Sequence, residues 1–213
     1  MDDGKDFWDH EWKSQTIDEY QSYLAYHLRS KPWFLKTFQD RNVKDVCDSA
    51  CGFGAYSAML SNNGFQVSGF DISPVAVKIT KQLLDRNKLK HNAYQVCDIC
   101  KIDFEDERFD AVVAHAVIDH LSATSAKDAL RELLRITRVG GLVYISFDPL
   151  EQDDLLEPHN VLSDGSFYYT NGSRSGLLFH YYQAEEIKLL VQDYCILEWR
   201  CSGRGERSIL IVK

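Results

Sequence analysis

The sequence predicts an α/β fold in which a doubly wound, mostly parallel seven-stranded sheet carries helices on both faces. From residue 43 onward, short apolar runs alternate with longer amphipathic runs, which is typical of parallel strands connected by helices. The chain after residue 195 departs from this pattern, because two strand-like runs follow each other around Gly203 and Gly205. Consecutive strands joined by a short turn form a hairpin, so we expect the last strand to be antiparallel.

Each expected element follows from its apolar pattern and from the residues that cap it. The expected strands cover five apolar or alternating runs, 43–50, 66–73, 92–99, 109–117 and 141–148. The expected helices cover four amphipathic runs, 55–64, 73–89, 125–140 and 184–194. Gly64 closes the first helix, and Gly140 with Gly141 ends the third. The second helix begins with Ser73 as its N-cap and Pro74 at its first position.

Length and composition predict one soluble domain over residues 1–213, since no repeat or Pro/Gly-rich linker divides the chain. The formal net charge of -8 argues against a nucleic-acid partner, which needs clustered Lys and Arg. The start "MDDGKDFWDHEW" is unlike a signal peptide, and no apolar run approaches the roughly 20 residues of a membrane span. We therefore expect a cytoplasmic protein without a membrane partner. Its oligomeric state has no signal in the sequence.

Two cysteines stand at a spacing that metal and redox sites use. Cys97 and Cys100 form a C-x-x-C pair, which can be a redox pair or half of a zinc site. A zinc site would need two more ligands from elsewhere in the fold. We expect unrelated cysteines near a strand end, and no metal site.

Acidic residues and glycines stand where the first three expected strands end. The first strand runs into Asp48-Ser49-Ala50-Cys51-Gly52-Phe53-Gly54, the second ends in Asp71 and the third in Asp98. Gly52 and Gly54 lack Cβ, so the chain can turn sharply and expose its backbone to a ligand. Ligands of open parallel sheets bind beyond the carboxyl ends of the strands. Asp71 can accept hydrogen bonds from ribose hydroxyls, and Asp98 can accept one from an adenine amino group.

The glycine spacing by itself is weak evidence. The dinucleotide pattern G-x-G-x-x-G would place Ala50 first and Ala55 last, which leaves only Gly52 intact. No Gly-Lys-Ser/Thr follows, so the loop is not a P-loop. The ordered set of acidic residues and glycines is more specific than the loop.

That set resembles the class I S-adenosylmethionine-dependent methyltransferases, in the small-molecule branch related to the ubiquinone/menaquinone-biosynthesis type (type 11/25). The first motif of this family, roughly Asp-x-Gly-x-Gly-x-Gly, matches Asp48 to Gly54 with Ala50 in place of one glycine. Its second and third motifs match Asp71 in "GFDIS" and Asp98 in "VCDI". "FDAVVAHAVIDHL" and "LLRITRVGGLVYIS" are similar to its later motifs. The resemblance covers about residues 40 to 213 and implies a Rossmann-like fold.

The resemblance also implies the cofactor, S-adenosylmethionine, which becomes S-adenosylhomocysteine after methyl transfer to a small-molecule substrate. A carboxylate ahead of the loop would repel a pyrophosphate, whereas S-adenosylmethionine has no phosphate and its ammonium group suits Asp48. Ile72 and Ile99 are available to pack against the adenine ring. The expected cofactor-binding residues are Asp48, Ala50, Cys51, Gly52, Gly54, Asp71, Ile72, Asp98, Ile99 and His115.

Methyl transfer needs a general base only if the accepting atom carries a proton. We select His180, at the entry to the last helix, as the preferred catalytic base. His115, at the end of the fourth strand, is the second catalytic candidate and is also expected to line the cofactor site. His120, in "AVIDHL", is a further candidate base but is expected to be structural, and Tyr181 or Tyr182 can serve as hydroxyl contacts.

Two segments are expected to control substrate choice. Residues 1–40 are predicted to form a helical lid, although their aromatic side chains are also typical of a packed helix core; they are Phe7, Trp8, Trp12, Tyr20, Tyr23 and Tyr26. Residues 148–183 are predicted to be a substrate-side insertion between strands five and six, with a small hairpin that turns at Asn171-Gly172. Five acidic residues from Asp148 to Glu157 are typical of a solvated face, and they can also favour a cationic or amine substrate.

Three alternatives remain open. A nucleic-acid methyltransferase would want a basic surface and an Asp/Asn-Pro-Pro-aromatic step where this chain has "HAVID". An NAD-dependent dehydrogenase is disfavoured by the loop spacing and the tail hairpin. A non-catalytic S-adenosylmethionine-binding protein would carry the same binding motifs.

Overall fold

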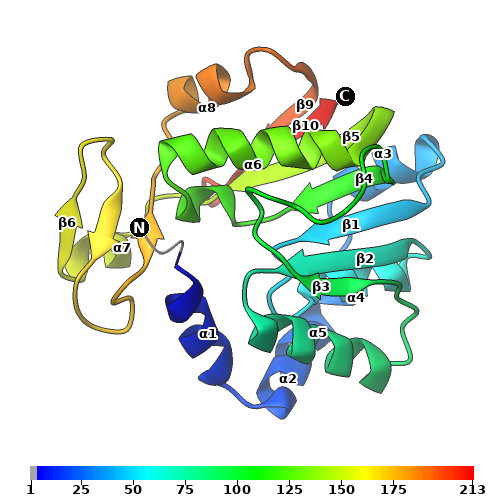
Figure 1. Cartoon of the computed structure of the whole chain (residues 1–213), viewed down its shortest axis with the longest axis horizontal. Helices are drawn as coiled ribbons and strands as arrows, with labels where there is room; N and C mark the ends of the chain where they lie inside the picture. Colours follow the sequence, from blue (N-terminus) through cyan, green and yellow to red (C-terminus); the bar gives the residue numbers. More distant parts are fainter. Residues whose placement is uncertain (1–3) are drawn as a thin grey trace.

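The computed structural model describes residues 4–213 and confirms the expected α/β fold. Its main sheet has seven strands in the order β3-β2-β1-β4-β5-β10-β9 (Figure 1). The strands are β1 (Asp45–Ser49), β2 (Gln66–Asp71), β3 (Tyr94–Val96), β4 (Phe109–Ala114), β5 (Thr137–Phe147), β9 (Cys195–Cys201) and β10 (Arg207–Val212). β10 pairs antiparallel with both β5 and β9, as predicted, whereas β1 to β5 pair parallel. The strand order reverses at β1, which is where such sheets bind ligands.

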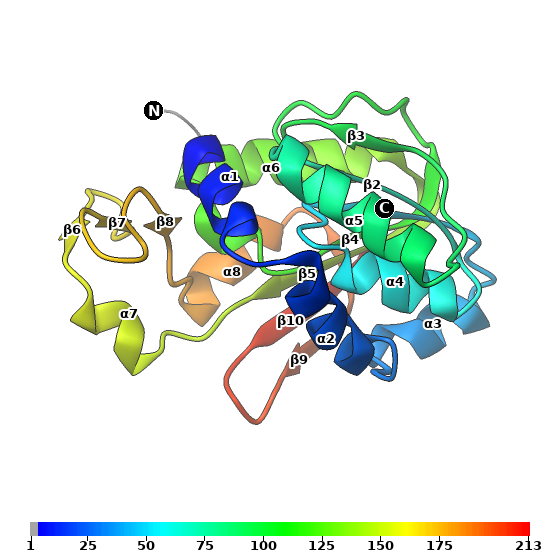
Figure 2. The ribbon, with the colours of Figure 1, turned by 90° about the horizontal axis from the view of Figure 1, so that it is seen from below.

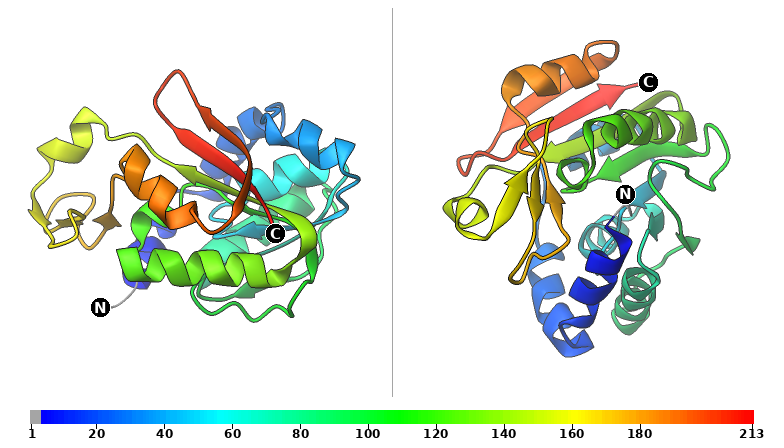
Figure 3. Two further views of the ribbon diagram at one scale, coloured as in Figure 1. Left: turned by 90° about the horizontal axis from the view of Figure 1, so that it is seen from above. Right: turned by 60° about the vertical axis from the view of Figure 1, so that its left-hand side comes forward.

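Helices cover both faces of this sheet (Figure 3). On one face lie α3 (Phe34–Asp40) and α4 (Ala55–Asn62), with α5 (Pro74–Arg86) beside α4; on the other lie α6 (Ala123–Ile136) and α8 (Ala184–Val191). Successive strand residues alternate between the two faces. In β1, Val46 belongs to the core under α3 and α4, and Cys47 to the core under α6 and α8. The sheet is therefore buried on both sides, and its polar strand ends are the part available to ligands.

The boundary between α6 and β5 differs from the prediction of a helix to residue 140. α6 ends at Ile136, and β5 begins at Thr137, which pairs with Phe109 of β4. Gly140 has a φ of 75°, and its N–H donates to the carbonyl of Lys213 at 2.9 Å. The helix prediction was wrong here because pairing with β4 and with the end of the chain outweighs the local helical pattern.

The segment between β5 and α8 contains more structure than the predicted hairpin. It forms α7 (Gln152–Leu156) and a three-stranded antiparallel sheet of β6 (His159–Val161), β7 (Phe167–Tyr169) and β8 (Leu178–Phe179). The chain passes from β7 to β8 through Asn171-Gly172, where the turn was expected. α7 and β6 are too short to leave a periodic pattern, so the sequence did not predict them.

Among residues 4–213, three helices, α1, α2 and α3, precede β1. α1 (Lys5–Lys13) lies between the small three-stranded sheet and the main body, and α2 (Ile17–His27) follows it beside α4 (Figure 2). The first three residues of the predicted lid segment 1–40 lie outside the described residues. Within residues 4–213, no helix is long and apolar enough to cross a membrane.

Candidate active site

A cavity of about 370 Å³ opens at the carboxyl ends of β1, β2 and β4, at the point where the strand order reverses. This size lies within the range of small-molecule sites. All the predicted cofactor-binding residues line it except Gly54. Its lining consists of Trp8, Trp12, His27, Asp48, Ala50, Cys51, Gly52, Phe53, Ala55, Tyr56, Phe70, Asp71, Ile72, Cys97, Asp98, Ile99, His115, Ala116, Val117, His120 and Leu121. We call it the first cavity.

The glycine loop is held by close contacts that only glycine permits. Gly54 has a φ of 87°, and a Cβ there would lie 2.8 Å from the Thr80 Cγ2 of α5. Gly52 has a φ of 53°, and a Cβ there would lie 2.9 Å from the ring of Trp12. The Thr80 hydroxyl donates to the carbonyl of Gly52 at 2.7 Å, which fixes the loop against α5. Gly54 therefore acts through packing, outside the cavity lining.

Ala50 stands in the same left-handed region, with a φ of 54°. A side chain with a Cβ is strained there by about 1–2 kcal/mol. This is the position at which the sequence replaces a glycine of the motif. The loop keeps the backbone path expected of a glycine despite the added methyl group.

Asp71 joins the glycine loop to the start of α5. Its Oδ2 accepts the N–H of Gly52, and its Oδ1 accepts the N–H of Ser73, each at 2.9 Å. Burial raises the pKa of Asp71 to about 6. Each carboxylate oxygen retains a second lone pair, so Asp71 can still accept hydrogen bonds from a ligand in the cavity.

Asp48 lies deeper, under the loop. The Ser57 hydroxyl donates to its Oδ2 at 2.5 Å, and the Tyr94 hydroxyl donates to Ser57 at 2.6 Å. Burial raises the pKa of Asp48 to about 7, and the nearby Asp71 adds to the effect. Among residues 4–213, no Lys or Arg lines the cavity to offset these carboxylates. A cationic ligand would bind favourably there, because its positive charge stabilises the ionised form of the two buried carboxylates.

Asp98 and Ile99 reach the cavity on the loop that follows β3. The Asp98 Oδ1 accepts the N–H of Cys100 at 2.8 Å, and the Cys97 thiol donates to the Lys101 carbonyl at 3.2 Å. The Cys97 thiol therefore serves a contact within the loop, whereas the Cys100 thiol donates to the carbonyl of Ser125 in α6 at 3.4 Å. All six cysteines are free thiols, and residues 4–213 hold no group of three or more metal-binding side chains.

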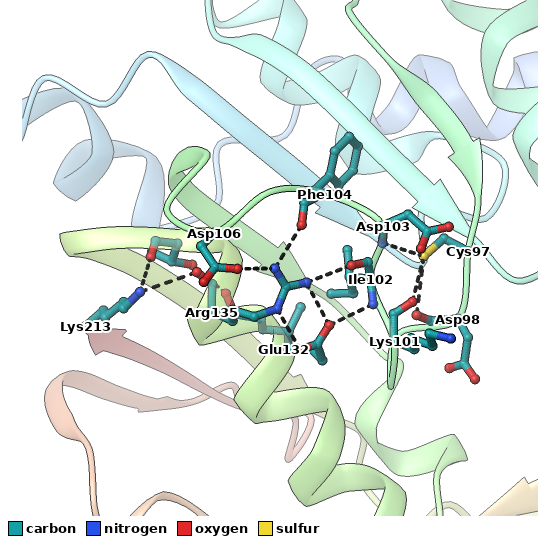
Figure 4. Close-up of polar contacts among 12 residues, drawn as sticks. Cys97, Asp98, Lys101, Ile102, Asp103, Phe104, Asp106, Glu132, Arg135 and Lys213 are labelled. Carbon is teal, nitrogen blue, oxygen red and sulfur yellow. Dashed lines mark hydrogen bonds and ion pairs between the residues drawn. The ribbon is translucent and has the colours of Figure 1, made fainter.

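Arg135 of α6 secures the rest of this loop (Figure 4). A guanidinium has five N–H donors, and each of them finds an acceptor here. Glu132 accepts two of the bonds, at 2.7 and 2.8 Å, and Asp106 accepts one at 2.6 Å. The other two go to the carbonyls of Ile102 and Phe104, at 2.7 and 2.9 Å. Arg135 thus positions the chain that carries Asp98, although it lies outside the cavity.

His115 follows β4 directly and lines the cavity as expected. Its ring stacks on Tyr56 with ring centroids 4.3 Å apart, and its Nε2 lies 3.8 Å from Glu206. Burial lowers the pKa of His115 to about 4, so the ring is neutral near pH 7. A neutral imidazole can orient a substrate, but a pKa this low makes a weak proton acceptor.

His180 lies apart from the first cavity. It is buried, with Nδ1 2.9 Å from the Ser166 hydroxyl and Nε2 3.3 Å from Glu186. Its backbone N–H donates to the carbonyl of Asp119 at 2.7 Å. These contacts tie the small sheet to the main body. His180 is not among the residues that line the first cavity, and its role as a base stays a prediction.

α1 supplies part of the wall of the first cavity, although the sequence allowed its aromatic residues to be either a lid or a packed core. Trp12 covers Gly52, and Trp8 meets His120 edge-on with ring centroids 5.0 Å apart. The Ser73 hydroxyl donates to Asp9 at 2.5 Å and anchors the helix. His27 and Tyr56 also line the cavity, and no sequence pattern distinguished them from core aromatics.

Comparisons with known proteins indicate a methyltransferase domain. Residues 47–145 match a family model described as a methyltransferase domain. An uncharacterised protein of Methanocaldococcus jannaschii is 25% identical over 167 residues, which are 76% of this chain and 69% of that protein. The malonyl-[acyl-carrier protein] O-methyltransferase of Salmonella typhimurium is 29% identical over 143 residues, 67% of this chain and 53% of the relative. The tRNA (carboxymethyluridine(34)-5-O)-methyltransferase of Arabidopsis thaliana is 31% identical over 122 residues, 57% of this chain and 28% of the relative.

Solved structures share the fold. A protein described as a SAM-dependent methyltransferase from Methanosarcina mazei aligns with a TM-score of 0.70 and 20% identity, over 86% of this chain and 98% of that one. The 1,6-didemethyltoxoflavin-N1-methyltransferase of Burkholderia thailandensis, with bound 1,6-didemethyltoxoflavin and S-adenosylhomocysteine, aligns with a TM-score of 0.64 and 15% identity, over 88% of this chain and 78% of that one. This chain thus spans about half of the Salmonella relative and a smaller part of the Arabidopsis one.

Proposed function

We propose that this chain, which belongs to the class I S-adenosylmethionine-dependent methyltransferases, uses S-adenosylmethionine to methylate a small-molecule acceptor. The observation that carries the proposal is the acidic first cavity over the glycine loop. S-adenosylmethionine carries an ammonium group and a sulfonium and has no phosphate. The carboxylates of Asp48, Asp71 and Asp98, in a lining without Lys or Arg among residues 4–213, suit that charge distribution.

The residues of the lining fit the parts of this cofactor. Asp71 retains lone pairs for the ribose hydroxyls, and Asp98 can accept from the adenine amino group between Ile72 and Ile99. Asp48, next to the loop, can organise the ammonium end. A dinucleotide fits less well, because its pyrophosphate would meet Asp48 and Asp71 at the start of α4. These roles disfavour the dehydrogenase alternative.

When bound, S-adenosylmethionine supplies an electrophilic methyl group on a positively charged sulfur. The chain's own contribution is then to position the acceptor and to exclude water. The stacked pair of Tyr56 and His115, and Trp8 elsewhere in the lining, are aromatic side chains that can do both. We extend the proposal to the two flanking segments: residues 1–40 act as the lid, and residues 148–183 form the substrate side.

A tRNA acceptor is the second candidate, because relatives named as tRNA methyltransferases occur among the matches. The net charge of -8 and the acidic cavity speak for the small molecule, since tRNA binding depends on neutralising phosphates.

Calorimetric titration separates these possibilities. We expect the protein to bind S-adenosylmethionine and S-adenosylhomocysteine and to show no binding of NAD or of total tRNA at about 150 mM salt. The Asp98→Asn variant should bind S-adenosylhomocysteine more weakly. Asp103→Asn is the matched control, because Asp103 lies exposed on the same loop and outside the lining. Binding of NAD in place of the two sulfur compounds would refute the proposal, and binding of tRNA would select the second candidate.

A non-catalytic binding protein would give the same titration, so turnover needs its own test. The protein should convert S-adenosylmethionine to S-adenosylhomocysteine in the presence of a suitable hydroxyl- or amine-bearing compound. Binding without any conversion across a broad set of small acceptors would favour the non-catalytic alternative.

A further inference from the structure

A second cavity, of about 380 Å³, adjoins the first one. Trp8, His120 and Leu121 line both cavities, so these side chains form the wall where the two cavities meet. The rest of the lining comes from the start of α6, from the small three-stranded sheet and its turns, and from the residue before α1. These residues are Gly4, Ser122, Ser125, Leu162, Ser163, Asp164, Tyr168, Gly176, Leu177 and Leu178. The two cavities therefore meet at these three side chains, and a molecule in the second cavity would lie next to the first.

His120 is the titratable side chain in that wall, and its tautomer follows from one hydrogen bond. Its Nδ1 lies 3.0 Å from the carbonyl oxygen of Leu178. A carbonyl oxygen can only accept, so Nδ1 carries the hydrogen of the neutral ring. The hydrogen bond found for the His120 ring among residues 4–213 is the one at Nδ1, so the lone pair of Nε2 remains free to accept a proton. Burial lowers the pKa of His120, which keeps the ring neutral near pH 7.

The charged side chain that lines the second cavity is acidic. Among the described residues, Asp164 contributes a carboxylate to the lining, and no Lys or Arg does. The Arg174 guanidinium acts on His120 from nearby but is paired with Asp154. The N-terminus of α6 faces the cavity, and the Ser122 hydroxyl already accepts the N–H of Ser125 there at 3.1 Å. An anionic molecule would find no cationic side chain in this lining, whereas a neutral or cationic one meets hydroxyls and a carboxylate.

We infer that the second cavity receives the methyl acceptor, that this acceptor carries a hydroxyl or amine and no anionic group, and that Nε2 of His120 takes its proton. The inference rests on the proposed function. In the step, the accepting oxygen or nitrogen forms a bond to the methyl carbon while the carbon–sulfur bond breaks, and that electron pair goes to sulfur. The proton released by the acceptor passes to Nε2 of His120, giving an imidazolium that later returns the proton to solvent. His120 thus takes the role of a base, which the sequence offered beside the structural role expected there.

Two small probes of opposite charge test the inference without knowledge of the natural acceptor. Tyramine and 4-hydroxyphenylacetate share a phenol ring, and the first carries an ammonium where the second carries a carboxylate. Each is titrated into the full chain saturated with S-adenosylhomocysteine, while nitrogen-15 NMR follows the histidine side chains. We expect Nε2 of His120 to be unprotonated at pH 7 and to shift when tyramine binds, and we expect tyramine to bind at least about tenfold more tightly than the acid. Asp164→Asn should reduce that preference about fivefold.

The matched variants are His120→Asn and His159→Asn. Asn at 120 can still donate to the Leu178 carbonyl but has no atom in the place of Nε2, so it isolates the proton-accepting atom from the structural bond. His159 makes the same kind of bond, from Nδ1 to the Glu157 carbonyl at 2.8 Å, and lines neither cavity. Because His120 lines both cavities, the variant is read by the difference between two affinities: His120→Asn should lose about fivefold more in tyramine affinity than in S-adenosylhomocysteine affinity. His159→Asn should change neither affinity.

The outcomes separate the inference from the proposed function. If S-adenosylhomocysteine binds but tyramine leaves the Nε2 signal unchanged, or if the acid binds as well as tyramine, the inference is wrong and the proposed function stands. A protonated Nε2 at pH 7 would also overturn it. If S-adenosylhomocysteine does not bind, the proposed function fails and the inference fails with it.

Discussion

Replacing Gly54 by alanine tests whether the glycine loop is held by its close approach to α5. A Cβ at this position would lie 2.8 Å from Cγ2, 3.0 Å from Oγ1 and 3.2 Å from Cα of Thr80. Thr80 is fully buried, so it cannot move aside without disturbing its neighbours. Overpacking of this kind typically costs about 1–3 kcal/mol. The φ of 87° adds strain of about 1–2 kcal/mol for any residue with a Cβ.

Gly64→Ala is the control that separates these two contributions. Gly64 has a φ of 91°, and nothing lies within 4 Å of a Cβ built there. Both variants therefore share the backbone strain, and only Gly54→Ala has the clash. We expect urea unfolding to show Gly54→Ala losing about 1–3 kcal/mol more than Gly64→Ala. Adding Thr80→Ser should restore part of the difference, because serine keeps the hydroxyl bonded to Gly52 and lacks Cγ2.

The same variants report on function through the affinity for S-adenosylhomocysteine. The Gly54→Ala protein, where it is folded, should bind the cofactor product more weakly, because the clash displaces the loop that carries Gly52 and Cys51 into the cavity. Gly64→Ala lies far from the lining and should bind normally. Equal losses of stability in the two variants would refute the packing argument.

Three further predictions concern the loop after β3, the buried carboxylates and the lid. Arg135→Lys cannot replace the forked set of hydrogen bonds, so it should lower the free energy of unfolding by about 1–2 kcal/mol and speed hydrogen exchange in residues 97–107. The pKa of Asp48, raised by burial to about 7 from 3.8, makes the folded protein bind more protons than the unfolded one in that interval. The free energy of unfolding of the protein should therefore fall as pH rises from about 4 to about 7. In urea unfolding, Asp48→Asn should remove the part of this pH dependence that comes from Asp48. Trp12→Ala uncovers Gly52 and should speed release of S-adenosylhomocysteine in stopped-flow measurements, whereas an unchanged rate would argue against the lid.

The sequence predicted the parts of the fold that local pattern determines. Strand ends with Asp48, Asp71 and Asp98 were identified because apolar runs fix where parallel strands stop, and carboxyl ends of such strands share one edge of the sheet. The start of α5 was identified from Ser73 and Pro74, and Ser73 does cap the helix. The antiparallel last strand followed from two adjacent runs joined by a short turn.

Features fixed by contacts between distant segments were missed or misplaced. β5 begins at Thr137 because it pairs with β4 and with the end of the chain, and neither partner is visible in the helical pattern of residues 125–140. His180 was chosen for its place in the sequence before the last helix, but its ring is held by Ser166 and Glu186 away from the first cavity. His120 was expected to be structural and does bond to the Leu178 carbonyl, but its place in both cavities exists only in three dimensions.

The N-terminal helix shows why such contacts decide function. Its aromatic residues read equally as a lid or as a core, since both bury an apolar stripe. In the structure Trp12 covers Gly52 of the first cavity, while Trp8, one helical turn earlier, forms part of the wall shared with the second. The bond from Ser73 to Asp9 fixes the helix against the start of α5. One nine-residue helix therefore touches both cavities at once, so a change that loosens it should affect cofactor and acceptor binding together.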